Sequence, residues 1–284
     1  MRVYISVDAE GCTGIFKLSQ VMPENPAYEF CRRMMEGDAN AAIAGAFKGG
    51  ATEVVVNDAH NNGDNIRIDR LDKRARLISG KDRHFSMMEG ISGEFGAAMF
   101  VGYHSRKGER GVISHTYYYS EIQEARINGE PVGESEINGF LAGSFGVPLA
   151  FLSGDQHITE SIKAKVPGIR TAATKRAIGH ASAECVNPEI SWKMIEEEAC
   201  AAISGLIRHS AAPLAAPPVR PMNDAPYLLE IRFATPGHAN RASLLPGSSR
   251  ISATEVGFNA ADYRDVFRAF LCLVTLASTF RENG

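Results

Sequence analysis

Short apolar runs alternate with longer stretches of helical periodicity through the first two-thirds of the chain. Such runs are typical of strands buried in a parallel sheet, and helices connect strands of this kind. Apolar runs that predict strands lie at 3–7, 52–57, 75–79, 97–103, 148–153 and 169–173. Helical patterns fill the intervals at 28–47, 134–145, 157–165 and 188–207. The alternation predicts an α/β fold with a mainly parallel sheet and helices on both faces.

The segment 111–132 breaks this alternation. Residues 112–119 are rich in β-branched and aromatic side chains, and residues 125–127 precede an Asn-Gly pair at 128–129. Asn-Gly is the strongest short signal for a hairpin turn. We therefore expect antiparallel strands that lie over the end of the sheet and carry His115 with them.

Proline is concentrated in one later segment of the chain. Four prolines fall within the thirteen residues 209–221, which is typical of an extended linker. A boundary there divides the chain into an α/β domain at 1–210 and a smaller α+β C-terminal domain or appendage at 211–284. Within the second part, strands are predicted at 227–233 and 251–256, and a helix at 261–280.

Composition narrows the class of protein. Among 284 residues, 44% are hydrophobic, and 30 Lys and Arg against 33 Asp and Glu leave a net charge of −3. No basic block occurs, so nucleic acid is not an expected partner. The N-terminus has no secretory pattern and no apolar run is long enough to span a bilayer, so we expect no membrane association. Five scattered cysteines without a Cys-x-x-Cys pair indicate a reducing, cytoplasmic setting.

Metal-binding side chains follow three of the predicted strands. Asp8 and Glu10 follow the first apolar run, His60 follows the second, and His104 follows the run at 97–103. The carboxyl ends of parallel strands meet at one edge, where ligands bind in open α/β sheets. Carboxylates together with imidazoles suit Zn²⁺ better than Mg²⁺ or Ca²⁺, which prefer oxygen ligands. The pattern predicts a zinc site, although each acid also fits a helix cap and each histidine a structural loop position.

Further side chains compete for roles at this site. Glu134 opens the helix that follows the hairpin, either as a ligand or as an acid that complements the helix dipole, and Glu136 is its competitor. Asp58 is either a ligand or the acceptor that orients a metal-bound histidine, and we favour the second role. Cys12, two residues beyond Glu10, is an alternative ligand, but a packing role is favoured.

The number of candidate ligands indicates the chemistry. If the two histidines, the two acids after the first strand and Glu134 all bind metal, five side chains serve the site. With Asp8 bridging, they make six protein bonds, three to each of two ions. Three protein ligands with an open position are the catalytic zinc pattern, and ions roughly 3.5–4 Å apart are suited to amide or ester hydrolysis. A metallohydrolase is therefore predicted.

Several short motifs occur in a definite order along the first half of the chain. They are Ser-Val-Asp-Ala-Glu-Gly at 6–11, Val-Asn-Asp-Ala-His at 56–60, Gly-Tyr-His at 102–104, Ser-His at 114–115, Pro-Val-Gly-Glu at 131–134 and Ser-Gly-Asp at 153–155. In these motifs the chain resembles the zinc-dependent D-aminopeptidases of the DppA type, peptidase family M55. The C-terminal part resembles that family only in general plan.

The resemblance implies a ligand set and a catalytic residue. Two zinc ions per chain would be held by a bridging Asp8, by Glu10 and His60 on one ion, and by His104 and Glu134 on the other. His115 would be the catalytic histidine. The family label makes it a nucleophile, whereas chemistry favours an acid/base or oxyanion-stabilising role, because metal-activated water already supplies a nucleophile. The resemblance also implies a large homo-oligomer, a decamer of stacked rings.

The predicted function is a cytoplasmic, dinuclear zinc aminopeptidase that hydrolyses short peptides or amino-acid amides with D-amino-acid N-termini. Asp58, Glu136 and Asp155 are candidates to receive the substrate amine. One alternative keeps the site but cleaves another small amide, such as a lactam or an N-acyl amine. A second is a non-catalytic α/β protein that binds a small molecule, which the lack of glycine-rich nucleotide motifs disfavours.

Overall fold

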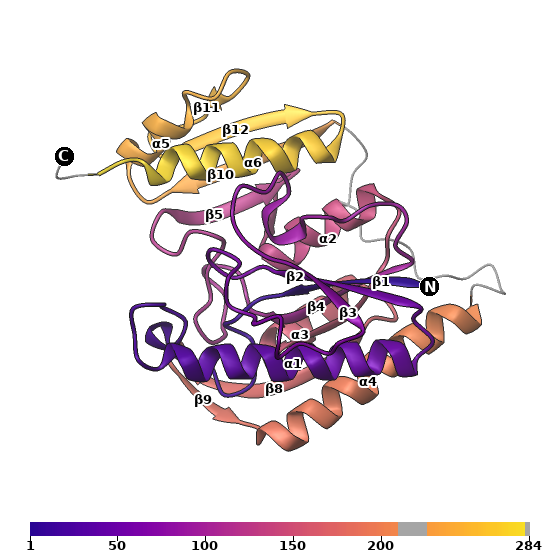
Figure 1. Ribbon diagram of the computed structural model, residues 1–284. Coiled ribbons are helices and arrows are strands. Elements are labelled where there is room, and N and C mark those ends of the chain that lie inside the picture. The colour runs from indigo at the N-terminus through magenta and orange to yellow at the C-terminus, as the bar shows by residue number, and fades with distance from the viewer. Residues whose placement is uncertain (210–225, 282–284) are drawn as a thin grey trace.

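A seven-stranded sheet forms the centre of the protein, whose computed structural model describes residues 1–209 and 226–281 (Figure 1). Its strand order is β3-β2-β1-β4-β7-β8-β9, and every neighbouring pair is parallel except β8 and β9. The strands are β1 (Arg2–Val7), β2 (Glu53–Asp58), β3 (Ala75–Ile78), β4 (Ala97–Tyr103), β7 (Leu149–Asp155), β8 (Arg170–Gly179) and β9 (Ser182–Cys185). The prediction of a mainly parallel α/β sheet is confirmed.

Helices cover both faces of this sheet, as predicted. The long helices α1 (Tyr28–Lys48) and α4 (Pro188–His209) pack side by side on one face (Figure 1). They share a core with side chains of β1, β2 and β4. On the other face, α2 (Glu134–Ser144) and α3 (Gln156–Lys165) join a second core. Because the central strands are buried on both faces, their sequences read as continuous apolar runs.

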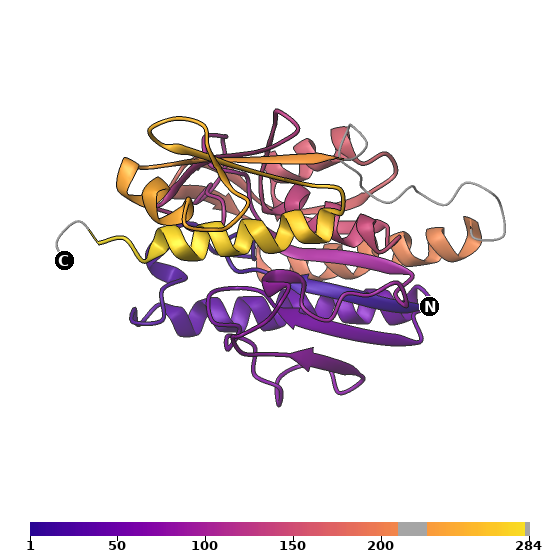
Figure 2. The ribbon, with the colours of Figure 1, turned by 90° about the horizontal axis from the view of Figure 1, so that it is seen from above.

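A second, five-stranded sheet has the order β11-β12-β10-β5-β6. Its elements are β5 (Ile122–Ile127), β6 (Glu130–Val132), β10 (Tyr227–Phe233), β11 (Ser249–Arg250) and β12 (Glu255–Ala260), with helices α5 (Pro236–Ala242) and α6 (Tyr263–Ser278). Figures 1 and 2 show α6 running alongside β10 and β12. Because β10 pairs with β5, this sheet draws strands from both predicted parts of the chain.

The predicted domain division at residue 210 stays a prediction. Of the proline-rich segment 209–221, all but the first residue lies outside the described residues. Two short 3₁₀ helices, η1 (Leu18–Gln20) and η2 (Ser86–Met88), complete the elements. No helix within residues 1–209 and 226–281 is both long and apolar enough to cross a membrane.

The hairpin is confirmed, but its first predicted strand is wrong. Asn128 and Gly129 form the turn between β5 and β6, both with positive φ. The β-rich residues 112–119 form an irregular loop instead, in which Ile113 has φ 51° and Tyr117 has φ 55°. A strand cannot accommodate such angles. Similarly, the strand expected at 251–256 begins only at Glu255.

Backbone contacts between β4 and the turn after β1 leave no room for a side chain at Gly102. This glycine has φ +73°, and an added Cβ would lie 2.2 Å from the Asp8 carbonyl oxygen. We expect Gly102→Ala to lower the free energy of unfolding by about 1–2 kcal/mol through the left-handed backbone and by roughly 1–3 kcal/mol more through the clash. Gly146→Ala is the matched control, because Gly146 has φ +76° but open space around it. Denaturant unfolding compares the two, and equal losses would contradict the clash.

Candidate metal centre

The ends of three adjacent strands hold the first ligand loop in place. β1 lies between β2 and β4 in parallel register. Beyond the last residue of β1, the Asp8 amide donates to Val101 O at 2.8 Å, and the Gly11 amide donates to Gly102 O at 2.7 Å. These bonds tie the turn that carries the two acids to the end of β4. The sheet therefore places Asp8 between the ends of β2 and β4, which carry the two histidines.

Asp8 lies at the centre of the predicted ligands and faces a separate group with each carboxylate oxygen. Its Oδ1 is 3.3 Å from His60 Nδ1, and that nitrogen is also 3.3 Å from Glu10 Oε2. Its Oδ2 is 3.5 Å from His104 Nε2, which is 3.4 Å from Glu134 Oε1. All five side chains are buried. The structure thus brings together the whole predicted ligand set, in two groups that share Asp8.

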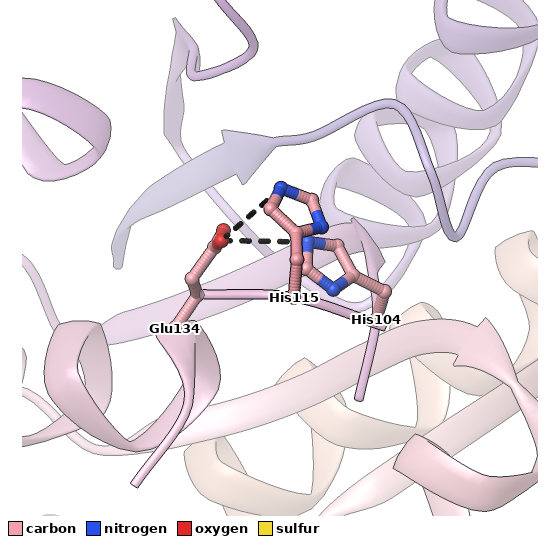
Figure 3. A group of neighbouring side chains, drawn as sticks. All are labelled: His104, His115 and Glu134. Atoms are coloured by element: carbon pink, nitrogen blue, oxygen red, sulfur yellow. Dashed lines mark ion pairs between the residues drawn. The ribbon is translucent and has the colours of Figure 1, made fainter. Parts of the chain in front are cut away.

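His115 lies beside the second group. Its ring stacks on that of His104, with centroids 4.2 Å apart and planes 7° from parallel. Figure 3 shows both histidines directed toward Glu134, whose Oε1 is 3.8 Å from His115 Nε2. His115 Nδ1 lies 2.8 Å from Ile113 O, so it carries the proton and leaves Nε2 facing the site. The loop 112–119 therefore places His115 at the site, where it is buried like His60 and His104.

Backbone acceptors orient the two histidines expected to bind metal. His60 Nε2 is 3.0 Å from Val21 O, and His104 Nδ1 is 3.0 Å from Ser105 O. Each bond places the proton on the outer nitrogen and leaves the inner nitrogen free for a metal. The prediction that Asp58 orients a ligand histidine is therefore wrong, because Val21 O holds the outer nitrogen of His60.

The cluster fits a metal because it contains buried polar atoms that form no hydrogen bond. Among the described residues, Asp8 Oδ2, Glu10 Oε2 and His104 Nε2 are buried without a hydrogen bond. An unsatisfied buried polar group costs about 1–3 kcal/mol, and more when it is charged. Three such atoms in one cluster indicate that a cation completes their coordination. Carboxylate oxygens and imidazole nitrogens are a ligand set that Zn²⁺ accepts.

Electrostatics of the bare cluster also favour a cation. Burial, and then the charge of Glu10, raises the pKa of Asp8 to about 7. Burial acts to lower the pKa of His104, but the surrounding carboxylates, Glu134 first and then Asp8 and Glu10, together raise the pKa to about 10. Protonated histidines thus balance the charge of Glu10 and Glu134, whose pKa values are lowered, and Asp8 takes up a proton more readily than an ordinary aspartate. A bound dication supplies that balance directly and displaces the protons.

The remaining acids predicted near the substrate are occupied elsewhere. Asp58 accepts from the amides of Asn65 and Ile66, both at 2.7 Å. Glu136 accepts from Lys165 Nζ at 2.6 Å, in an ion pair. Neither acid lines the pocket at the site. Both stabilise the loops around the ligands, so the prediction that they receive a substrate amine is wrong.

Two other predicted residues also have structural contacts. Asp155 caps α3 by accepting from the His157 amide at 2.8 Å, and it accepts from the Val112 amide at 2.8 Å, which secures the start of the loop that carries His115. It too is absent from the pocket wall. Cys12 Sγ donates to Asp8 O at 3.0 Å, so it packs under the ligand turn rather than joining the ligand atoms.

A buried lysine that the sequence analysis did not identify supports the turn that carries Asp8 and Glu10. Lys175, at 2% exposure on β8, donates from Nζ to Glu10 O at 2.9 Å and to Cys12 O at 2.5 Å. Burial lowers the pKa of Lys175. A fully buried lysine is rare, but only its position near a predicted strand end in Ala-Ala-Thr-Lys could have drawn attention to it.

The cluster opens into a cavity of about 660 Å³. Apolar side chains from η1 and its neighbours, including Val21 and Met22, form one wall, and Leu271 and Val274 of α6 contribute to another. The wall also includes a run of three tyrosines at 117–119. A cavity of this size accommodates a small molecule or a short peptide. Its metal-binding end is polar and its walls are partly apolar.

Comparisons with known proteins agree with this geometry. A family model described as D-aminopeptidase, peptidase family M55, matches residues 1–272. The chain is 35% identical over 278 residues to a D-aminopeptidase of Bacillus subtilis (strain 168), covering 98% of both chains. The solved structure of the Zn-dependent D-aminopeptidase DppA from Bacillus subtilis, described as a self-compartmentalizing protease, superposes with a TM-score of 0.92 at 34% identity and covers 99% of both chains.

The matches to the two relatives extend over nearly the whole of both chains and so cover the residues of both sheets. They support a hydrolase that acts on peptide bonds and give no support to the lactam, N-acyl amine or non-catalytic alternatives. The chain belongs to the M55 family of D-aminopeptidases.

Proposed function

We propose that this protein is a zinc-dependent aminopeptidase that removes D-amino acids from the N-termini of short peptides or amino-acid amides. The observation that carries the proposal is the position of Asp8, whose two carboxylate oxygens face two separate histidine–carboxylate pairs. That arrangement suits a bridging ligand between two ions. Glu10 and His60 would complete one zinc site, and His104 and Glu134 the other.

Each residue then has a defined part in hydrolysis. When bound, two zinc ions supply Lewis acidity that polarises a carbonyl and makes water nucleophilic at neutral pH. The five ligands hold these charges in a buried site, where electrostatic interactions are strong. His115 Nε2 faces the cluster with its other nitrogen fixed on Ile113 O. From there it exchanges a proton with the reacting groups or stabilises the developing oxyanion.

The assembly and the cellular location of this chain remain proposals. The relative of solved structure is described as self-compartmentalizing, and we propose that this chain likewise forms a homo-oligomer. The decamer of stacked rings is the specific form expected. A cytoplasmic location is consistent with the scattered cysteines, of which Cys12 and Cys31 are buried as free thiols.

The proposed activity predicts turnover with stereochemical preference. We expect zinc-loaded protein to cleave D-aminoacyl amides and D,D-dipeptides with a kcat/KM at least about tenfold above that of the L-enantiomers, or ~1.4 kcal/mol in transition-state binding. Steady-state rates on enantiomeric pairs test this, with chelator-treated protein as the control. Equal rates on both enantiomers, or turnover that survives complete metal removal, would contradict the proposal.

The bridging assignment predicts an asymmetry between two neighbouring acids. Asp8→Ala should lose both metals, because the bridging carboxylate contacts both sites and offsets the repulsion between two dications. Glu10→Ala should retain one. Elemental analysis after dialysis measures the metal content per chain. Asp64→Ala, an exposed acid four residues after His60, is the matched control and should keep both ions. An Asp8→Ala protein that holds two metals would rule out the bridge.

The position of His115 predicts a loss of turnover without a loss of metal. His115→Ala should lower kcat by ~10²–10⁴-fold, the usual contribution of a positioned proton donor or acceptor. Its metal content should stay unchanged, because the ring stacks beside the ligand group and its Nδ1 bonds only to backbone. His84→Ala, an exposed histidine, should keep full activity. A decrease below tenfold would make His115 a structural loop residue.

A further inference from the structure

The cavity carries a short cationic rim, defined here as Lys81, Asp82 and Arg83. All three residues line the pocket that also contains Asp8, Glu10 and His60. Two cations and one anion leave the rim with one net positive charge. Within the described part of the chain, neither Lys81 nor Arg83 forms an ion pair, although most other arginines of the protein do. The rim thus offers positive charge that the protein leaves without a carboxylate partner.

Arg83 is anchored by hydrogen bonds although it forms no ion pair within the described residues. Its Nη1 donates to Asn57 Oδ1 at 2.7 Å and to Asp58 O at 2.8 Å, at the end of β2. Asn57 is itself fixed, because its Nδ2 donates to Met87 O at 2.6 Å. The contacts of Arg83 within residues 1–209 and 226–281 leave Nε and Nη2 without a protein acceptor. These two donors form the edge of a guanidinium that pairs with a carboxylate through two parallel hydrogen bonds.

The anchor of Arg83 lies close to the metal centre along the chain. Asp58 O, which Arg83 contacts, belongs to the residue two positions before His60. Two extended residues span at most about 7 Å. In a dipeptide bound for cleavage, the C-terminal carboxylate lies one residue beyond the scissile bond, about 3.5 Å away along the chain. Arg83 and His60 thus both lie near the end of β2, in the wall of one cavity.

We propose that Arg83, assisted by Lys81, binds the C-terminal carboxylate of the substrate and so discriminates a free acid from its amide. The inference rests on the proposed function, because it assumes cleavage at the Asp8 cluster. It assigns the two ends of the cavity to the two ends of the substrate. The metal centre receives the amino-terminal residue and its scissile carbonyl, and the rim receives the carboxylate. Lys81 is exposed and contributes long-range attraction, whereas Arg83 supplies the directed hydrogen bonds.

The test uses one peptide in two forms that differ only at the C-terminus. A dipeptide with a D-amino-acid N-terminus is compared with its own C-terminal carboxamide, and initial rates of release of the first residue are measured on zinc-loaded protein. We expect the free acid to have a kcat/KM roughly tenfold to a hundredfold higher, the range of a charge-assisted hydrogen bond. Arg83→Met should reduce that ratio to within about threefold of one. Lys81→Met should reduce it less.

The ratio separates recognition from structural damage. If Arg83 only supported the end of β2, Arg83→Met would slow both substrates equally and leave the ratio unchanged, which would overturn the proposal. Equal rates on acid and amide in the unaltered protein would also overturn it. Arg70→Met is the matched control, because Arg70 is an exposed arginine paired with Asp69 on the surface, and its ratio should match that of the unaltered protein.

A binding measurement keeps this inference distinct from the proposed activity. Calorimetry with the same dipeptide and dipeptide amide compares their affinities for the unaltered protein and for Arg83→Met. Stronger binding of the acid that depends on Arg83 supports the carboxylate subsite even if neither compound is cleaved, in which case the proposed function fails alone. Cleavage of both compounds with no difference in rate or affinity supports the proposed function and rejects the subsite.

Discussion

The turn after β1 holds two carboxylates in the interior of the protein. The contacts of the rest of the site keep these two buried acids in place. Asp8 and Glu10 are buried, and each has an oxygen that no hydrogen bond satisfies within the described residues. The turn can stay there because backbone bonds tie it to the end of β4 and Lys175 supports its carbonyls from beneath. Gly102 permits the close contact that these bonds require. The sheet thus holds two neighbouring buried carboxylates, and a bound cation neutralises their negative charge.

The parts of the fold that depend on local pattern could be predicted from the sequence. Continuous apolar runs give the central strands, because both of their faces are buried, and the side chains that follow them fall at one edge by topology alone. Asp8, His60 and His104 were found in this way, and their contacts occur as the order β2-β1-β4 requires. Glu134 was a candidate from its place at a helix start, but only the family resemblance chose between a ligand and a helix-start acid, and the catalytic role of His115 came from that resemblance alone.

The features that sequence patterns missed depend on contacts between distant segments. Residues 112–119 have strong β-propensity, but the loop is held by Asp155, which accepts from the Val112 amide, and by Glu134, which accepts from the Tyr117 amide at 2.6 Å. These tertiary bonds override the local preference. The acids expected to meet a substrate were likewise misjudged, because each already has protein partners that strand-end position does not predict, such as Lys165 for Glu136. A polar residue next to a strand end can serve the site or merely secure it, and only the partners distinguish the two.

The residues that determine the reaction and those that determine the substrate come from different parts of the fold. The ligands come from the ends of neighbouring strands and the helix start beside them, so the reaction class depends on the parallel sheet itself. Much of the cavity wall comes instead from α6, near the C-terminus, and from loops. It includes Leu271 and Val274 of α6 and the rim at 81–83. Because β10 pairs with β5 and α6 packs on β10, the C-terminal part brings Leu271 and Val274 to the cavity wall. Sequence change in these walls can therefore alter which peptide is accepted while the sheet keeps the chemistry constant.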